Sequence, residues 1–101
     1  MNVTGNIECV STAVADGAAL LDQENEGWWV NISLDILDVN SPFNCIRGQL
    51  YGSYCEGRQA LGIESGEGDI YGFDCHAGQH TFDTLNELWG YLITARRETA
   101  A

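Results

Sequence analysis

The sequence predicts an all-α protein, a compact bundle of three main helices in one small domain that spans residues 1–101. Three stretches, residues 6–25, 42–61 and 81–97, repeat apolar residues at intervals of three and four, as the buried face of a helix does. Each stretch also carries residues that favour a helix start or stop at its ends. With 45% hydrophobic residues, the chain has enough apolar surface to form a core.

The first helix is expected over residues 6–25. Its apolar stripe recurs at i, i+3, i+7, i+11 and i+14, and it consists of Ile7, Val10, Val14, Ala18 and Leu21. Gly27 follows the stripe and tolerates the left-handed conformation that ends many helices. Trp28 and Trp29 come next, and we interpret them as core anchors rather than as a platform for a ligand.

Residues 28–39 allow two interpretations. The apolar residues alternate with polar or smaller ones at Trp28, Val30, Ile32, Leu34 and Ile36, which is typical of a half-buried strand. No second stretch of comparable strand quality occurs in the chain, and a lone strand has no partner for its backbone groups. We therefore expect a short irregular or helical segment here.

The middle helix is expected over residues 42–61. Ser41 is a typical N-cap residue, Pro42 is well tolerated at the first helical position, and Gly62 can end the helix. Three glycines lie inside this stretch, and each costs about 1 kcal/mol relative to Ala in a helix. Gly48 and Gly52 are four residues apart and so share one face, where another helix can approach closely. We expect tight packing within the chain at this face, with a partner surface as the alternative.

The last helix is expected over residues 81–97, and Arg96 and Arg97 at its end have the sign that suits the helix dipole. Together the three helices and the segment between them predict one core. Its members are Val10, Val14, Leu21, Trp28, Trp29, Ile32, Leu34, Ile46, Leu50, Tyr54, Leu61, Phe73, Phe82, Leu85, Leu88, Trp89 and Leu92.

Charge is the strongest compositional feature. Fifteen Asp and Glu residues stand against four Arg and no Lys, so the formal net charge is −11. This charge argues against direct binding to DNA or RNA, because phosphate contacts need a basic patch. The acidity has three interpretations, namely solubility, adaptation to high salt, and a negative surface for a basic partner. The acids are scattered along the chain, which favours the first.

The third interpretation includes mimicry of a nucleic acid, which would need carboxylates in a row. The candidates for such a row are Glu56, Glu64, Glu67, Asp69 and Asp74, which follow one another from the middle helix into a glycine-rich loop.

Four Cys and two His are the candidates for a metal site. Cys75 and His80 can share a zinc ion with Cys45 or Cys55, but no Cys-x-x-Cys pair is present. Buried thiols and surface histidines are therefore favoured, and no cofactor or metal is predicted. Cys45 and Cys55 would lie about 15 Å apart along one helix, too far for a disulfide. No catalytic motif occurs, so we do not expect an enzyme.

The order of short motifs resembles that of small uncharacterised proteins from actinobacterial phages, including mycobacteriophages, over most of the chain. The most specific elements are Gly27-Trp28-Trp29 and Gly48-Gln49-Leu50-Tyr51-Gly52. The resemblance implies a virus-encoded accessory protein. It supplies no activity, ligand or catalytic residue. The chain also has no apolar run of membrane-spanning length and no signal-peptide pattern at its start, so we expect it in the host cytoplasm.

The sequence thus predicts a non-enzymatic phage accessory protein that binds and modulates a bacterial host protein. The predicted partner-binding residues are Gly48, Tyr51, Gly52, Glu64, Glu67 and Asp69. Alternatives are an acidic mimic that inhibits a nucleic-acid-binding protein, and a small zinc-stabilised or redox protein. No direct contact with nucleic acid or membrane is expected, and the oligomeric state is not predicted.

Overall fold

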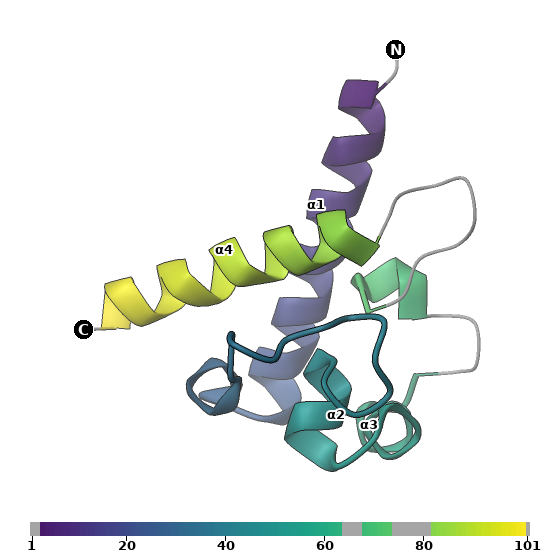
Figure 1. Ribbon diagram of the computed structural model, residues 1–101, viewed down its shortest axis with the longest axis vertical. Coiled ribbons are helices and arrows are strands. Elements are labelled where there is room, and N and C mark those ends of the chain that lie inside the picture. Colours follow the sequence, from purple (N-terminus) through teal and green to yellow (C-terminus); the bar gives the residue numbers. More distant parts are fainter. Residues whose placement is uncertain (1–2, 64–67, 74–81, 101) are drawn as a thin grey trace.

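The computed structural model describes residues 3–63, 68–73 and 82–100 (Figure 1). Its elements are α1 (Val3–Glu24), η1 (Trp28–Asn31), α2 (Ile46–Tyr51), α3 (Tyr54–Leu61), η2 (Gly68–Tyr71) and α4 (Phe82–Ala100). The described part of the chain contains helices and no strand, which confirms the predicted all-α class. The two long helices α1 and α4 cross, and the short helices α2 and α3 lie beside the C-terminal half of α1 (Figure 1).

Helix α1 occupies the stretch predicted for the first helix, beginning three residues earlier. It ends near Gly27, whose φ of 77° is the left-handed conformation that its sequence position suggested. Trp28 then turns back, and its indole Nε1 donates a 2.9 Å hydrogen bond to Asp22 on the last turn of α1. Trp28 is the first residue of η1, and the extended residue Ile32 follows this short helix, so the prediction of irregular or short helical structure is confirmed.

The prediction of one middle helix over residues 42–61 is wrong. The chain turns at Ser41, whose Oγ accepts hydrogen bonds from the backbone N–H groups of Phe43 and Asn44. The Ser41-Pro42 signal therefore belongs to a turn. Helix α2 begins later, at Ile46, and the Sγ of Cys45 caps it by accepting from the Gly48 N–H.

The break between α2 and α3 falls at Gly52 and Ser53. Gly52 has a φ of 105°, which a helix does not contain. Ser53 starts the second helix, because its Oγ accepts a 3.2 Å hydrogen bond from the N–H of Glu56. This Ser-x-x-Glu pattern is a helix start in the sequence itself. Gly62 ends α3 in the left-handed conformation, as predicted.

The expectation of tight packing within the chain is confirmed at Gly48 but not at Gly52, which is exposed and lies at the C-cap of α2. A Cβ added to Gly48 would come within 2.5 Å of the backbone of Phe43, and one added to Gly57 would come within 2.5 Å of the Cβ of Arg47. The first contact closes the turn onto α2, and the second allows α2 and α3 to pack side by side. Both glycines are buried.

Trp89 of α4 lies at the centre of the core. Its ring stacks on Phe73 at 5.5 Å and meets the edge of Trp28 at 5.8 Å, and its Nε1 donates a 2.7 Å hydrogen bond to the carbonyl of Gly72. The predicted core residues that are buried are Val14, Leu21, Trp28, Ile32, Ile46, Leu61, Phe73, Leu85 and Trp89. Those that pack against them while half-buried are Trp29, Leu34, Leu50, Phe82, Leu88 and Leu92.

Tyr54 and Val10 are the two predicted core residues that are not found in the described core. Tyr54 is exposed, so its assignment to the core is wrong, because the break at Gly52 removes it from the helical stripe of α2. Val10 lies in α1, but its side chain is outside the described residues. The core also contains residues that the predicted core did not include, namely Ala18, Val39, Cys45, Ile63, Ile93 and the side chain of Arg47.

Candidate functional site

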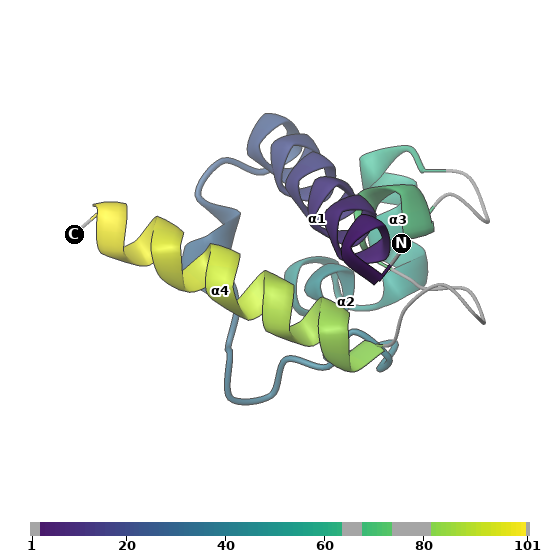
Figure 2. The same ribbon diagram turned by 90° about the horizontal axis from the view of Figure 1, so that it is seen from above.

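A groove of about 380 Å³ lies between α4 and the segment that follows η1. Its described lining residues are Leu34, Leu37, Asn86, Glu87, Gly90, Tyr91 and Thr94. Figure 2 shows this segment on the side of α4 that faces away from α1. The groove therefore lies on the outside of the bundle, where two chain segments far apart in the sequence come together.

The segment that forms one wall of the groove is held by side chains from two helices. Asn86 of α4 accepts a 2.7 Å hydrogen bond from the Val39 N–H through its Oδ1. Gln49 of α2 accepts from the Ser33 N–H at 2.7 Å and donates to the carbonyls of Ser33 and Asn44. These bonds pair backbone groups that have no secondary-structure partner, so the wall is positioned before any ligand arrives.

Arg97 fixes the end of the same segment nearest η1. Its guanidinium donates to the carbonyl of Trp29 at 2.9 and 3.2 Å and also to the carbonyl of Ile32. The guanidinium therefore pairs backbone carbonyls that η1 leaves without helical partners. The sequence predicted only that Arg97 interacts with the dipole of its own helix. Its hydrogen bonds to distant backbone carbonyls were not predicted.

Gly90 forms part of the groove and differs from the other helical glycines. A Cβ added there would have no described atom within 4 Å apart from its own helix backbone and chain neighbours. The neighbouring Tyr91 is 70% exposed. A glycine in a helix interior costs about 1 kcal/mol relative to Ala, and here no contact within the described chain requires it.

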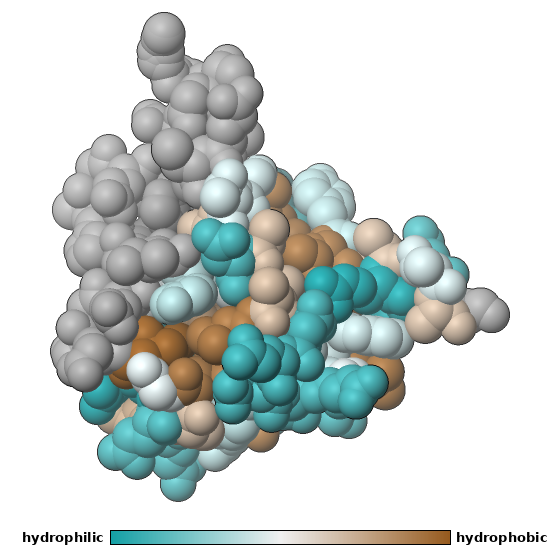
Figure 3. Space-filling model, turned by 180° about the vertical axis from the view of Figure 1, so that it is seen from behind, coloured by the Kyte–Doolittle hydropathy of each residue, from teal (hydrophilic) through white to brown (hydrophobic). Residues whose placement is uncertain are grey.

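The exposed face of α4 is acidic. Asp83, Glu87 and Glu98 are exposed on this helix, and Asp35 and Asp38 are exposed in the opposite segment. The described lining of the groove contains no Lys or Arg. On the face seen from behind, hydrophilic residues are spread over the described surface with hydrophobic residues between them (Figure 3).

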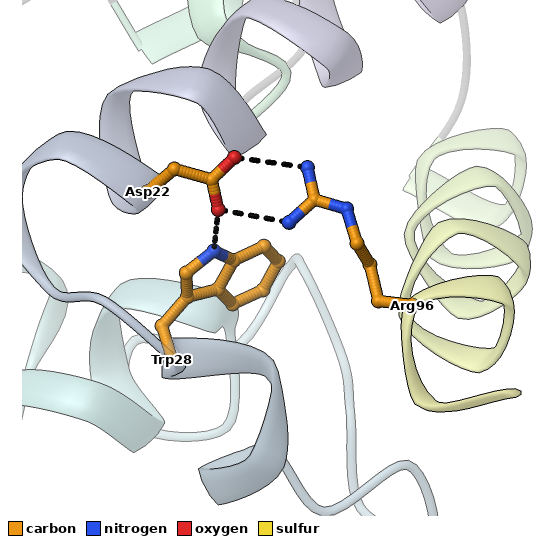
Figure 4. A network of polar contacts seen from close by, with 3 residues as sticks. All are labelled: Asp22, Trp28 and Arg96. Atoms are coloured by element: carbon orange, nitrogen blue, oxygen red, sulfur yellow. Dashed lines mark hydrogen bonds and ion pairs between the residues drawn. The ribbon is translucent and has the colours of Figure 1, made fainter. Parts of the chain in front are cut away.

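One polar network joins α1 to α4 (Figure 4). Arg96 donates two hydrogen bonds to the carboxylate of Asp22, at 2.8 and 3.0 Å, and Trp28 donates a third. These contacts, chiefly the hydrogen bond from Arg96, lower the pKa of Asp22 below its usual value, although partial burial opposes the shift. The network is structural, because Trp28 and Arg96 both donate to the same Asp22 carboxylate and so hold η1 and α4 against the end of α1.

A second hollow, of about 230 Å³, lies beside α2. Its lining includes Arg47, which is only 3% exposed and lies over the rings of Phe73 and Tyr54 at 5.1 and 5.8 Å. These contacts make Arg47 part of the core. Beside the hollow, a hydrogen bond with the Cys55 side chain raises the pKa of Tyr54.

The predicted partner-binding residues lie only partly within the described part of the chain, where three of them belong to α2 or its C-cap. Gly48 is buried under its own chain, Tyr51 is half-buried against the core, and Gly52 is exposed as the cap of α2. Glu64 and Glu67 lie outside the described residues, and so does the side chain of Asp69, which belongs to η2.

The predicted row of carboxylates cannot be traced either. Of its members, Glu56 is exposed on α3, and Asp74 lies outside the described residues. The acidic mimic therefore stays a prediction.

The metal hypothesis also falls largely outside the described residues, because Cys75 and His80 lie there. Among the residues described, no group of three His, Cys, Asp or Glu side chains is placed to hold a metal ion. Cys45 and Cys55 are not joined by a disulfide, as expected, but they lie at the starts of two helices rather than in one. Cys45 is buried, in agreement with the interpretation of buried thiols, whereas Cys55 is exposed.

Sequence reasoning missed the groove, although a signal for it exists. Gly90 interrupts the apolar pattern of the last helix between Trp89 and Tyr91, and a glycine there needs a reason just as Gly48 does. Comparisons with protein-family models, with curated proteins and with solved structures give no match. In the described part of the chain, no helix combines the length and apolar composition needed to cross a membrane.

Proposed function

We propose that this protein is a non-enzymatic accessory protein of phage origin that binds and modulates a bacterial host protein through the groove between α4 and the Leu34–Leu37 segment. The single observation that carries this proposal is the open space beside Gly90 in the interior of α4. The helix gives up stability at this position, and no contact within the described chain explains the glycine. A close approach by a partner does explain it.

The form of the groove supports binding rather than chemistry. Two half-buried leucines and an exposed tyrosine line it. Tyrosine is among the residues that most often contribute binding energy at protein interfaces, typically where it lies beside a pocket. The hydrogen bonds from Asn86 and Gln49 hold one wall in place, which reduces the ordering cost of binding. A preformed apolar groove of this kind suits a side chain of another protein.

The test compares two leucine substitutions on the same helix. Gly90→Leu fills the groove, whereas Ala95→Leu adds a leucine at an exposed position of α4 that does not line it. Wild type and both variants are immobilised and exposed to an actinobacterial lysate. We expect the wild type and Ala95→Leu to retain the same host protein and Gly90→Leu to lose it.

The retained protein is then purified, and its affinity for each variant is measured by calorimetry. We expect Gly90→Leu to bind at least tenfold more weakly, because the leucine occupies the space of the partner's side chain. Circular dichroism verifies that each variant is folded. Equal affinity of the folded Gly90→Leu variant and the wild type would place the partner elsewhere and end the proposal.

A further inference from the structure

The charges around the groove restrict what can occupy it. Glu87 lines the groove, and Asp83 lies one turn before it on the same face of α4, at the i, i+4 spacing of helix neighbours. Glu98 continues this face one turn beyond Thr94. Asp35 and Asp38 are exposed in the opposite segment and follow the lining residues Leu34 and Leu37 directly in the sequence, so both sides of the groove have carboxylates next to their lining residues.

The two arginines of α4 are directed away from these carboxylates. Arg96 is bound to Asp22 on the other side of α4, and Arg97 donates to the carbonyls of Trp29 and Ile32. Each guanidinium is thus directed at a partner in the chain that lies outside the groove lining. The groove thus has apolar lining residues, one lining carboxylate at Glu87 and further carboxylates beside it, with no cation in its described lining.

We infer that the groove receives a basic segment of the partner protein, in which one bulky apolar side chain is flanked by Lys or Arg. This inference rests on the proposed function and names the chemistry of its partner. The apolar side chain enters the notch at Gly90 between Leu37 and Tyr91, and the cations face Glu87 and its neighbours. The apolar lining residues supply affinity through burial of the partner's side chain, and the carboxylates supply orientation and a faster encounter.

A second copy of this chain does not fit the groove as well. The formal net charge is −11, so two copies repel each other at neutral pH. The two copies would also bring acidic groove walls toward an acidic surface, and like charges brought together at an interface cost several kcal/mol. A basic segment relieves the same repulsion on binding.

The experiment uses displayed random peptides of about twelve residues, the length of a short recognition segment. Peptides are selected on immobilised wild-type protein after removal of those that bind Gly90→Leu, so only groove-dependent binders remain. We expect these peptides to carry a net positive charge and to share one Trp, Phe, Leu or Met flanked by Lys or Arg.

The outcomes separate the two proposals. Groove-dependent peptides that are neutral or acidic would overturn the basic partner but leave the binding groove in place. Absence of any peptide that distinguishes wild type from Gly90→Leu would count against the groove itself, and the proposed function would fail with it. Self-association of the wild type that Gly90→Leu abolishes, measured by analytical ultracentrifugation, would replace the basic partner with a second copy.

A pair of charge variants then tests the walls with a selected peptide. Asp83→Asn/Glu87→Gln removes two charges from the groove face, and Asp16→Asn/Glu24→Gln removes two exposed charges from α1. We expect the first variant to weaken binding about tenfold at low salt, mainly through a slower association, and the control to change it less than about twofold. The difference should shrink at high salt. Equal losses in both variants would mean that net charge alone attracts the peptide, which would overturn the role of the walls.

Discussion

The two long helices each carry a glycine in their interior, and the two glycines have opposite surroundings. Gly17 of α1 is buried, and a Cβ there would lie 2.0 Å from the carbonyl oxygen of Tyr71 and 3.1 Å from the ring of Trp89. Gly90 of α4 has no described atom within 4 Å of the same added Cβ. One glycine lets η2 and the core close on α1, and the other leaves a notch on the surface.

The comparison separates two reasons for tolerating a poor helix former. At Gly17 the loss of helix propensity is offset by packing that no larger residue permits. At Gly90 the loss has no compensation within the described chain. Glycine in a helix is therefore informative only together with its surroundings, and the difference can be measured as opposite changes in stability.

The largest effect is expected for Gly17→Ala. The added methyl group overlaps a backbone oxygen that cannot rotate away, so α1 and η2 have to separate. We expect a loss of about 3 kcal/mol in the free energy of unfolding, at the upper end of the range for overpacked cores. Urea denaturation followed by circular dichroism measures the loss. An unchanged urea midpoint would show that η2 moves freely relative to α1, and the comparison with Gly90 would lose its basis.

Gly90→Ala should have a smaller effect of the opposite sign. Alanine gains about 1 kcal/mol of helix propensity over glycine, and there is space for its methyl group. For a domain of this size, the melting temperature should rise by about 4–8 °C. Thermal denaturation provides the measurement, with Ala95→Gly as the reverse substitution on the same helix. Destabilisation by Gly90→Ala would indicate a contact within the chain and remove the main argument for a partner.

The sequence is sufficient to predict the helical class, the two long helices and most of the core, because these depend on apolar spacing along a continuous helix. The ends at Gly27 and Gly62 were also predictable, since each glycine follows an apolar stripe. These features are local, and local physical preferences agree with the fold at each of them.

The break in the middle helix and the groove were not predicted, for different reasons. The break has a local signal, the Ser53-x-x-Glu56 start after Gly52, which competed with a good apolar stripe that runs across it. The groove has little local signal because its two sides come from distant parts of the sequence; the bond that joins them links Val39 and Asn86, which are 47 residues apart. The partners of Gln49 and Arg97 are backbone groups, and these leave no trace in residue types.

The smallest effect concerns the ion pair that joins the two helices. Because the pKa of Asp22 is lowered in the folded protein, its contribution to stability is present above the ordinary pKa of about 3.8 and is lost as the pH falls through the lowered value.

Asp22→Asn removes the charge but keeps an oxygen that can accept from Trp28. At pH 7 we expect this variant to lose about 0.5 kcal/mol, because both partners are partly exposed and screened by solvent. As the pH is lowered toward 2, the difference in stability between the two proteins should shrink, since the wild-type carboxylate becomes protonated as the pH falls through its lowered pKa. The difference between their urea midpoints isolates Asp22, because all other carboxylates titrate in both proteins. A difference that stays constant from pH 7 to pH 2 would mean that Arg96 contributes packing rather than charge, and the junction of α1 and α4 would then depend on the apolar core alone.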